Sequence, residues 1–532
     1  MIARNSLAGA ALAALAFLGA CGPSGPSTSN LVTLHRGNGA EPDTLDTQKS
    51  STLYELNILT DLFEGLMTMD ASGHPIYGAA VSHTVSSDGL VWTFKLRDEK
   101  WSDGVPVTAD DFVFSFRRIL DPNTAAQYAS LIYPIKNAQP VNEGKLPVTQ
   151  VGVRAIDPQT VEITLEHPTP YLLTLLTHQT CTPVPKHLVE KYGDKWVKPG
   201  TMASNGPYML AEWIPNTHVK VVKNPYYYDA AQVQIDVIYY YPISDSSIEL
   251  KRYQAGALDM TDDAPAREIA TLKKKYGDEL HLHAWESNRY IQINVRRKPF
   301  NDLRVREALA LAIDREAIAN NIYGAGQTPA YAFVPPGVGG YKGGAKLAFK
   351  DMPMDARRAK ARELLAQAGF GPGHPLRFTY RYNESIDNRR QAIAVQDMWR
   401  QIGVVCELLN SDTRVHYNAL RTQDFEVTAA AWTADYDDAE DFLFLMEGNS
   451  GQMNYSKYVN PAYDSLLHRA ANTLDPDKRS DLLRQAEQTM LDDVPVIPVV
   501  NDAYRRLVKP YVKGYEDNLL KWHRTRYMRI EK

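Results

Sequence analysis

Short segments with strand or helix periodicity follow one another along the whole chain. Residues 91–97 alternate apolar and polar side chains, and residues 233–241 are rich in β-branched and aromatic ones, so both are predicted strands. Helices are predicted from caps and apolar spacing at four places: one started by Asn301 or Asp302 and running to about Tyr323, 355–368 with Gly369 as C-terminal cap, 387–402, and 477–492. The pattern predicts a mixed α and β chain without internal repeats.

The glycine-rich stretch 337–344 is the one candidate for a phosphate loop. It lacks the G-x-G-x-x-G spacing, and no Gly-Lys-Ser/Thr follows it. We therefore interpret it as a surface loop between a strand and a helix.

The N-terminus has the pattern of a targeting signal. Arg4 provides a positive charge, and residues 7–17 form an apolar stretch too short to span a bilayer. Leu18-Gly19-Ala20-Cys21 is similar to a bacterial lipobox, which makes Cys21 the predicted lipidation site; an ordinary secretory signal with a chance cysteine is the alternative. We predict a signal peptide over 1–20 and a flexible tether over 21–30, because the latter is rich in Gly, Ser and Pro.

Size and composition narrow the class of protein. A chain of 532 residues is expected to form two to four domains, and 44% apolar and 23% charged residues are globular values. The net charge of -5 gives no support for nucleic-acid binding. The 30 Tyr and 8 Trp suit a wet binding cleft, although a Tyr-rich core and surface would have the same composition.

Motifs for catalysis or metal binding are absent from the sequence. H-E-x-x-H, G-x-S-x-G and C-x-x-C do not occur, and no cofactor is indicated. In a strand, the side chains of His281 and His283 would lie on the same face. We favour two solvent-exposed histidines over a metal site as the interpretation of this pair. The acidic run 435–441 lacks the spacing of a calcium loop. Cys181 and Cys406 could form one disulfide, but a buried free thiol is favoured for Cys406.

Residues 87–118 carry a resemblance to a known family. Trp101-Ser102-Asp103-Gly104 and the segment 107–112, which opens a helix, resemble the signature of the large bacterial extracytoplasmic solute-binding proteins that serve peptide and nickel importers. The likeness covers nearly the whole mature chain and is greatest to the oligopeptide-binding members of family 5. Further matching segments are 61–66, 204–208, 253–256, 299–302 through 314–315, 431–436 and 506–510.

The resemblance implies a fold. Members of this family have an α/β (mixed α+β) two-lobe periplasmic-binding-protein fold of the cluster C type, hinged, with an extra domain. Carried over to this sequence, lobe I comprises 31–62, 186–286 and 502–532, the extra domain attached to it comprises 63–185, and lobe II comprises 287–501.

The resemblance also implies how a ligand is held. Peptides of varied sequence share backbone amides and charged ends, and strand addition exploits the amides. The implied pairing edges are Ser51, Thr52 and Leu53 on one side and Ala431, Trp432 and Thr433 on the other. Asp435 is implied as the partner of the peptide ammonium, although an exposed loop aspartate is the plain alternative. Tyr128 and Trp432 are implied as aromatic walls of side-chain pockets, or else as core residues.

The sequence departs from the family pattern where the peptide carboxylate binds. Two positions that carry arginine in relatives are Leu420 and Ala429 here, so Arg421, Arg414, Asn388 and His178 are candidates to replace them. This puts the preferred peptide length in doubt and admits a peptide with an unusual carboxyl end, such as a cell-wall peptide. Two further positions that form a cysteine pair in relatives are Ser287 and Thr433, and Gln292 stands where an acidic residue is expected.

The expected function is capture of short peptides for delivery to an ABC permease and its ATPase subunit. The expected location is the periplasm or the outer face of the cell membrane, with a monomeric protein attached by its lipid anchor and no enzymatic activity. Three alternatives stay open: the same fold binding another ligand (murein peptide, nickel chelate, haem or a sugar-like molecule), a peptide-sensing receptor without transport, and a secreted hydrolase.

Overall fold

A computed structural model describes residues 31–532, of which Val32–Lys532 form one unit by their internal contacts. The predicted signal peptide, Cys21 and the tether lie outside the described residues. No helix in the described part of the chain is long and apolar enough to cross a membrane.

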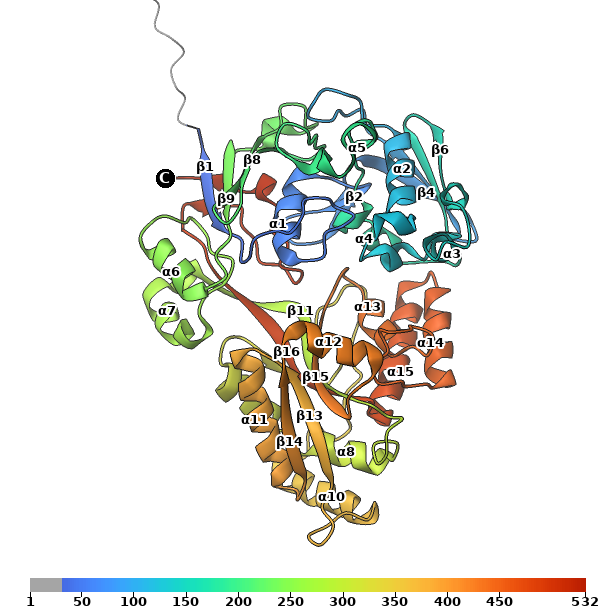
Figure 1. Cartoon of the computed structure of the whole chain (residues 1–532), viewed down its shortest axis with the longest axis vertical. Coiled ribbons are helices and arrows are strands. Elements are labelled where there is room, and N and C mark those ends of the chain that lie inside the picture. Colours follow the sequence, from blue (N-terminus) through green and yellow to red (C-terminus); the bar gives the residue numbers. More distant parts are fainter. Residues whose placement is uncertain (1–30) are drawn as a thin grey trace, which may run out of the picture. The chain divides into compact units, whose positions relative to one another are not determined.

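The first lobe is built on two four-stranded sheets (Figure 1). One has the order β1 (Thr33–Gly37), β10 (Val237–Tyr241), β9 (His218–Lys223) and β8 (Tyr208–Ile214), with β1 parallel to β10. The other has the order β4 (Ala80–Val85), β5 (Val91–Leu96), β7 (Thr160–Thr164) and β6 (Val153–Asp157), with the amphipathic α2 (Ala109–Leu120) packed on it. Helix α1 (Leu53–Leu62) packs against β8, and one hydrophobic core runs through both sheets.

The second lobe is built on a six-stranded mixed sheet. Its order is β12 (Thr328–Pro329), β16 (Val496–Leu507), β11 (Leu280–Ile293), β15 (Val427–Thr433), β13 (Arg377–Asn383) and β14 (Val405–Ser411). Its main helices are α8 (Leu303–Leu311), α10 (Met354–Gln367), α11 (Ile386–Arg400), α12 (Thr413–Thr422), α14 (Pro461–Ala471) and α15 (Pro476–Asp493). A second large core fills this lobe.

Two long antiparallel strands, β11 and β16, reach from the second lobe toward α6 (Ser246–Gln254) and α7 (Ile269–Tyr276) (Figure 1). Their pairing is interrupted between Ala284 and Asn288, which is a β-bulge or irregularity. A small separate hydrophobic cluster packs beside their outer ends. These strands form a connection between the lobes, and irregular pairing at such a point lets the strands bend.

The predicted elements are confirmed with shifted ends, except for one helix. The strand predicted at 233–241 begins only at Val237. The helix predicted to run to Tyr323 stops at Leu311, because Asp314 caps a new helical segment by accepting a hydrogen bond from the Ala317 N–H. The buried Arg315 guanidinium donates to the carbonyls of Ala310 and Ile313 at this break.

Candidate ligand-binding cleft

Strand β15 has one side that is only partly paired. It pairs with β11 along its whole length, from Val427 to Thr433, but among the described residues β13 pairs with it only at Val427 and Thr428. The carbonyl of Ala429 accepts a hydrogen bond from His416 Nε2 at 3.0 Å. The edge at 430–433 is therefore available for strand addition by an extended ligand. Ala431, Trp432 and Thr433 are half-buried there.

Asp435 follows directly after this edge. Its backbone N–H and Trp432 Nε1 both donate to the same carboxylate oxygen of Asp441, each at 3.0 Å, which fixes the turn after the strand. The Asp435 carboxyl group is half-buried and receives a hydrogen bond from the Tyr128 hydroxyl of the first lobe. Burial raises the pKa of Asp435 to about 7, and the Tyr128 hydrogen bond lowers it.

Other carboxyl groups surround Asp435. Asp441 is buried, and burial followed by the charge of Asp435 raises its pKa well above the ordinary value. Burial and the neighbouring Asp437 raise the pKa of Glu286 to about 10, so this group is neutral at pH 7. Crowded carboxyl groups with raised pKa values favour a cationic ligand, because a nearby positive charge stabilises their ionised forms.

The opposite wall is aromatic. The Tyr128 ring lies 5.2 Å from the His178 ring, which in turn lies 6.1 Å from Trp522. Burial lowers the pKa of His178 to about 3, so the imidazole is neutral and cannot supply a positive charge to a ligand carboxylate. We therefore assign His178 to the wall.

The predicted edge at Ser51, Thr52 and Leu53 lies at the start of α1. Thr52 and Glu55 form a capping box, in which the Glu55 carboxylate accepts the backbone N–H groups of Ser51 at 2.7 Å and Thr52 at 2.9 Å. These two donors are thus already used within the chain. Any ligand contact from this segment must come from its carbonyls, its side chains or the Leu53 N–H.

The candidate groups for a ligand carboxylate differ in their surroundings. Arg414 and Arg421 are exposed on α12. Asn388 accepts a hydrogen bond from Arg289 at 3.0 Å and donates to Asn383. Leu420 and Ala429 are both buried in the core of the second lobe.

Sequence reasoning missed two arginines on the strands that flank β15. Arg289 on β11 lies opposite Ala431, and Arg381 on β13 lies opposite Thr428. The Arg289 Nε donates to both oxygens of Asp502, at 2.9 and 3.1 Å. The available signal for Arg381 was its position between Tyr380 and Tyr382 in a strand, whereas the polar residues before Arg289 gave no comparable signal.

The two histidines of the H-x-H pair are not brought together with a third ligand. His281 Nδ1 lies 2.8 Å from Asp517, and His283 Nδ1 lies 2.8 Å from the carbonyl of Ala284. No group of three metal-ligating side chains is found within residues 31–532.

Two further predictions concern the cysteines and the glycine-rich stretch. Cys181 and Cys406 are both free and buried, and a buried free thiol is what the sequence favoured for Cys406. The stretch 337–344 is a loop between β12 and α10.

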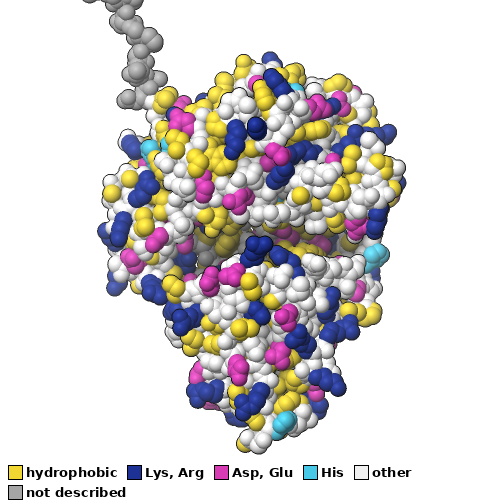
Figure 2. Space-filling view, viewed as in Figure 1, with side chains coloured by type: hydrophobic (Ala, Val, Ile, Leu, Met, Phe, Trp, Pro, Cys, Tyr) yellow, Lys and Arg dark blue, Asp and Glu magenta, His cyan; other side chains and the backbone are white. Residues whose placement is uncertain are grey.

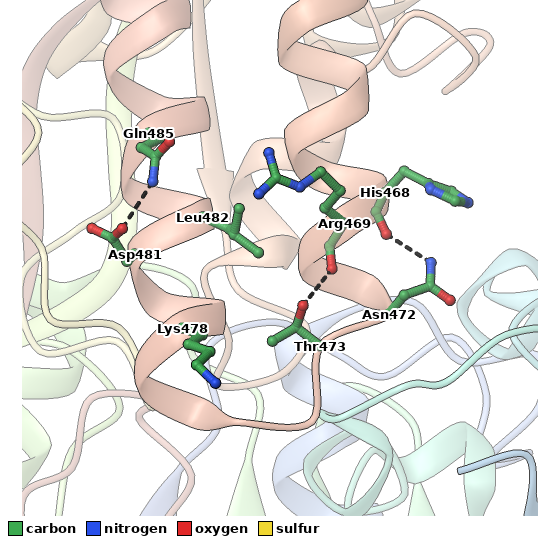
Figure 3. A pocket seen from close by; sticks show the side chains of 8 residues that line it. All are labelled: His468, Arg469, Asn472, Thr473, Lys478, Asp481, Leu482 and Gln485. Atoms are coloured by element: carbon green, nitrogen blue, oxygen red, sulfur yellow. Dashed lines mark hydrogen bonds between the residues drawn. The ribbon is translucent and has the colours of Figure 1, made fainter. Parts of the chain in front are cut away.

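Space-filling shows a hollow between the two lobes, with Lys and Arg side chains at its rim (Figure 2). A separate groove lies between α14 and α15 (Figure 3). Its polar groups are largely satisfied locally: Asn472 donates to the His468 carbonyl, Thr473 to the Arg469 carbonyl, and Gln485 to Asp481. The groove therefore offers few free partners, whereas the cleft at β15 offers an edge and a carboxylate.

Several known proteins are similar to this chain over most of its length. Residues 74–454 match the family "Bacterial extracellular solute-binding proteins, family 5 Middle". The periplasmic oligopeptide-binding protein OppA of Escherichia coli is 40% identical over 491 residues, covering 91% of this chain and 89% of that protein. The structure of Haemophilus influenzae OppA in complex with RPPGFSPFR aligns with a TM-score of 0.81 at 35% identity, covering 94% and 99% of the two chains.

A third similar protein is the Escherichia coli murein tripeptide binding protein MppA. Its structure aligns with a TM-score of 0.83 at 34% identity, covering 95% of this chain and 99% of that one. All three likenesses extend over both lobes, since each covers nine-tenths or more of the chain. The mixed α/β two-lobe chain described above therefore belongs to the bacterial extracellular solute-binding proteins of family 5.

Proposed function

We propose that this chain captures short peptides with a free amino terminus outside the cytoplasm and delivers them to an ABC importer. It acts as a binding protein and not as an enzyme. The names of its relatives, oligopeptide-binding and murein tripeptide binding, support a peptide ligand. The open edge of β15 supports an extended one.

The observation that carries this proposal is the place of Asp435. Its carboxyl group lies where the unpaired edge of β15 ends, between the two lobes, in contact with Tyr128. A peptide that extends this edge brings its ammonium group to Asp435. The ion pair would be enclosed by Tyr128 and Trp432, where charge-assisted hydrogen bonds are strong.

Strand pairing explains tolerance of sequence. Ala430 and Ala431, at the unpaired edge of β15, have small side chains, so the backbone of this edge is accessible to a ligand backbone. Backbone hydrogen bonds do not depend on side-chain identity, and alternate ligand side chains point to opposite faces. Water in roomy pockets can then accommodate different side chains at small cost.

Calorimetric titration tests the ammonium assignment. Wild-type protein is titrated with Ala-Ala-Ala and with N-acetyl-Ala-Ala-Ala, and the acetylated peptide is expected to bind at least about 100-fold more weakly, because one partner of an enclosed ion pair is lost. Asp435→Asn should abolish this preference. Asp424→Asn is the matched control, because Asp424 is exposed and precedes the opposite end of β15. Equal binding of both peptides by the wild type would refute the proposal.

Attachment to the membrane is the second part of the proposal. Cys21 follows the lipobox-like segment, and the tether 21–30 would leave the lobes free to move. We propose lobe boundaries at 31–62, 186–286 and 502–532 for lobe I, 63–185 for the extra domain and 287–501 for lobe II, with a monomeric protein. Cys21→Ser should release the mature protein from membranes in a cell fractionation, and mass spectrometry of the wild type should show a diacylglyceryl mass.

A murein peptide is a second candidate ligand. It is favoured by the apolar residues Leu420 and Ala429, at positions where the family resemblance implies arginine, and by the likeness to MppA. Native mass spectrometry of the purified protein distinguishes the two. A ladder of di- to pentapeptide masses supports mixed peptides, and a single mass containing diaminopimelate supports a cell-wall peptide.

A further inference from the structure

A small hollow lies beside the loop that follows α10, at the end of the second lobe that points away from the first (Figure 1). Its volume is about 540 Å³, which is within the range of small-molecule sites. Two cations, Lys298 and Arg377, line it together with Phe370, His374 and Pro375. None of these residues belongs to the peptide cleft at β15.

The two cations have no partner in the part of the chain that the structure describes. Lys298 and Arg377 are both exposed, and neither side chain forms an ion pair or a hydrogen bond there. The neighbouring Arg304, in contrast, lies 2.6 Å from the Asp302 carboxylate. Two like charges on one concave surface repel each other, and an anion between them would remove this repulsion.

The wall of the hollow is held in one shape. The rings of Phe370 and His374 stack with their centroids 5.6 Å apart and their planes at 10°. Gly371 and His374 exchange two backbone hydrogen bonds, at 3.1 and 2.9 Å, which close the loop into a tight turn. Pro372 and Pro375 restrict the same backbone further. The loop thus offers a fixed aromatic surface to carbon groups that adjoin a bound anion.

The hollow is separate from the peptide cleft. Arg377 is the first residue of β13, and Asn383 is the last. The six steps between them cover about 20 Å of extended chain. Strand β15 runs parallel to β13, and its free edge at 430–433 begins only near the carboxyl end of β13. A peptide at that edge therefore does not reach the hollow, which needs a ligand of its own.

We propose that this hollow binds a phosphate monoester, with Lys298 and Arg377 on the phosphate group and Phe370 against the organic part. A phosphate monoester carries a charge of about −1.5 to −2 at pH 7, which matches two cations. The guanidinium offers parallel donors to two phosphate oxygens, and the ammonium adds a point charge. The inference goes beyond the proposed function, because a peptide can bind while the hollow is empty.

The size of the hollow supports an organic phosphate over the bare ion. Its 540 Å³ equals the liquid volume of roughly 18 water molecules, at about 30 Å³ each. A phosphate group alone leaves most of this space unused. The same chemistry is found in soluble phosphate monoesters and in the headgroup of phosphatidic acid, so the test has one arm for each source.

The first arm is calorimetric titration with glycerol 3-phosphate in low-salt buffer without phosphate. The wild type is expected to bind it, and added NaCl should weaken binding. Lys298→Gln combined with Arg377→Gln should weaken binding at least about tenfold, because both charge-assisted contacts are lost. Arg358→Gln combined with Lys360→Gln is the matched control, since it removes two cations of α10 that do not line the hollow.

The second arm is sedimentation with vesicles of POPC alone and of three parts POPC to one part POPA. It uses Cys21→Ser, so that no acyl chain of the protein contributes. Binding to POPA vesicles without binding of glycerol 3-phosphate identifies the lipid as the source, and the reverse identifies a soluble monoester. In either case the double variant at Lys298 and Arg377 should lose the binding.

Three results would overturn the inference: a wild type that binds neither probe, a double variant at Lys298 and Arg377 that binds as well as the wild type, or an equal loss in the α10 control. Ala-Ala-Ala affinity should be unchanged in the double variant, which checks that this variant folds. A wild type that fails to bind Ala-Ala-Ala would refute the proposed function and leave the phosphate result as it stands.

Discussion

The ring of Tyr171 in the first lobe stacks on the ring of Tyr436 in the second, with centroids 5.3 Å apart and ring planes at 9°. Both residues are buried. The Arg479 guanidinium lies 5.4 Å from the centre of the Tyr171 ring and is held by two hydrogen bonds to Asp438, at 2.7 and 2.8 Å. The segment that carries Asp435 is thus fixed against the opposite wall of the cleft.

Removing the Tyr171 ring should favour the open arrangement of the lobes. Tyr171→Ala deletes an aromatic pair, worth about 0.5–1.5 kcal/mol beyond the area it buries, and a cation–π contact. We expect a larger radius of gyration in solution scattering without ligand and a roughly 3- to 30-fold loss of Ala-Ala-Ala affinity. Tyr226→Ala, which removes a 46% exposed ring from the first lobe, is the control. An unchanged scattering profile and affinity would show that this contact does not contribute to closure.

Peptide affinity should depend on pH through Asp435. Its pKa is about 7 in the free protein, and an ammonium ligand binds the ionised form. Affinity should therefore fall as pH drops below 7, by up to roughly tenfold per unit below pH 6, and fall again above about pH 8 as the peptide amine deprotonates. Titration calorimetry from pH 5 to 9 measures this, and Asp435→Asn should give a flat acidic limb. A wild-type affinity that is constant between pH 5 and 7 contradicts the assignment.

The same group should affect stability with the opposite sign. A carboxyl group with a raised folded-state pKa keeps its proton between about pH 4 and 7, so the folded state is favoured at acidic pH and loses this advantage as pH rises through 7. Asp435→Asn should therefore raise the thermal midpoint of the ligand-free protein at pH 8, by roughly 1–3 °C, and change it little at pH 4. Scanning fluorimetry at the two pH values suffices. A lower midpoint of the variant at pH 8 would contradict the prediction.

Ser287 and Thr433 are cross-strand partners on β11 and β15, with their hydroxyl oxygens 3.1 Å apart. The resemblance to the family implies a cysteine pair at the corresponding positions of relatives. We expect Ser287→Cys with Thr433→Cys to form a disulfide that raises the thermal midpoint by roughly 2–5 °C, because it closes a long loop of the unfolded chain. Reduction should remove the gain, and each single variant is the control. Thiol titration checks bond formation, since Cys181 and Cys406 are buried.

Much of the architecture could be predicted from local sequence. The Thr108-Ala109-Asp110-Asp111 segment produced the expected helix start, because Thr108 and Asp111 form a capping box. Gly369 follows the end of α10 with φ +91, a positive φ of the kind that glycine adopts after the last residue of a helix. The prediction of one helix continuing past Leu311 was wrong, in part because the buried Arg315 guanidinium donates to the carbonyls of Ala330 and Pro498, which lie far away in the chain.

The sequence by itself determined the family, the mixed α and β pattern and the candidate role of Asp435, because caps, periodicity and short motifs are local properties of the chain. Tertiary structure alone decided that Glu55 uses the donors of Ser51 and Thr52, that His178 is buried and neutral, and that Arg381 lies beside the free edge of β15. The physical reason is that pKa values, hydrogen-bond satisfaction and charge pairing depend on neighbours brought together from distant segments by the two cores.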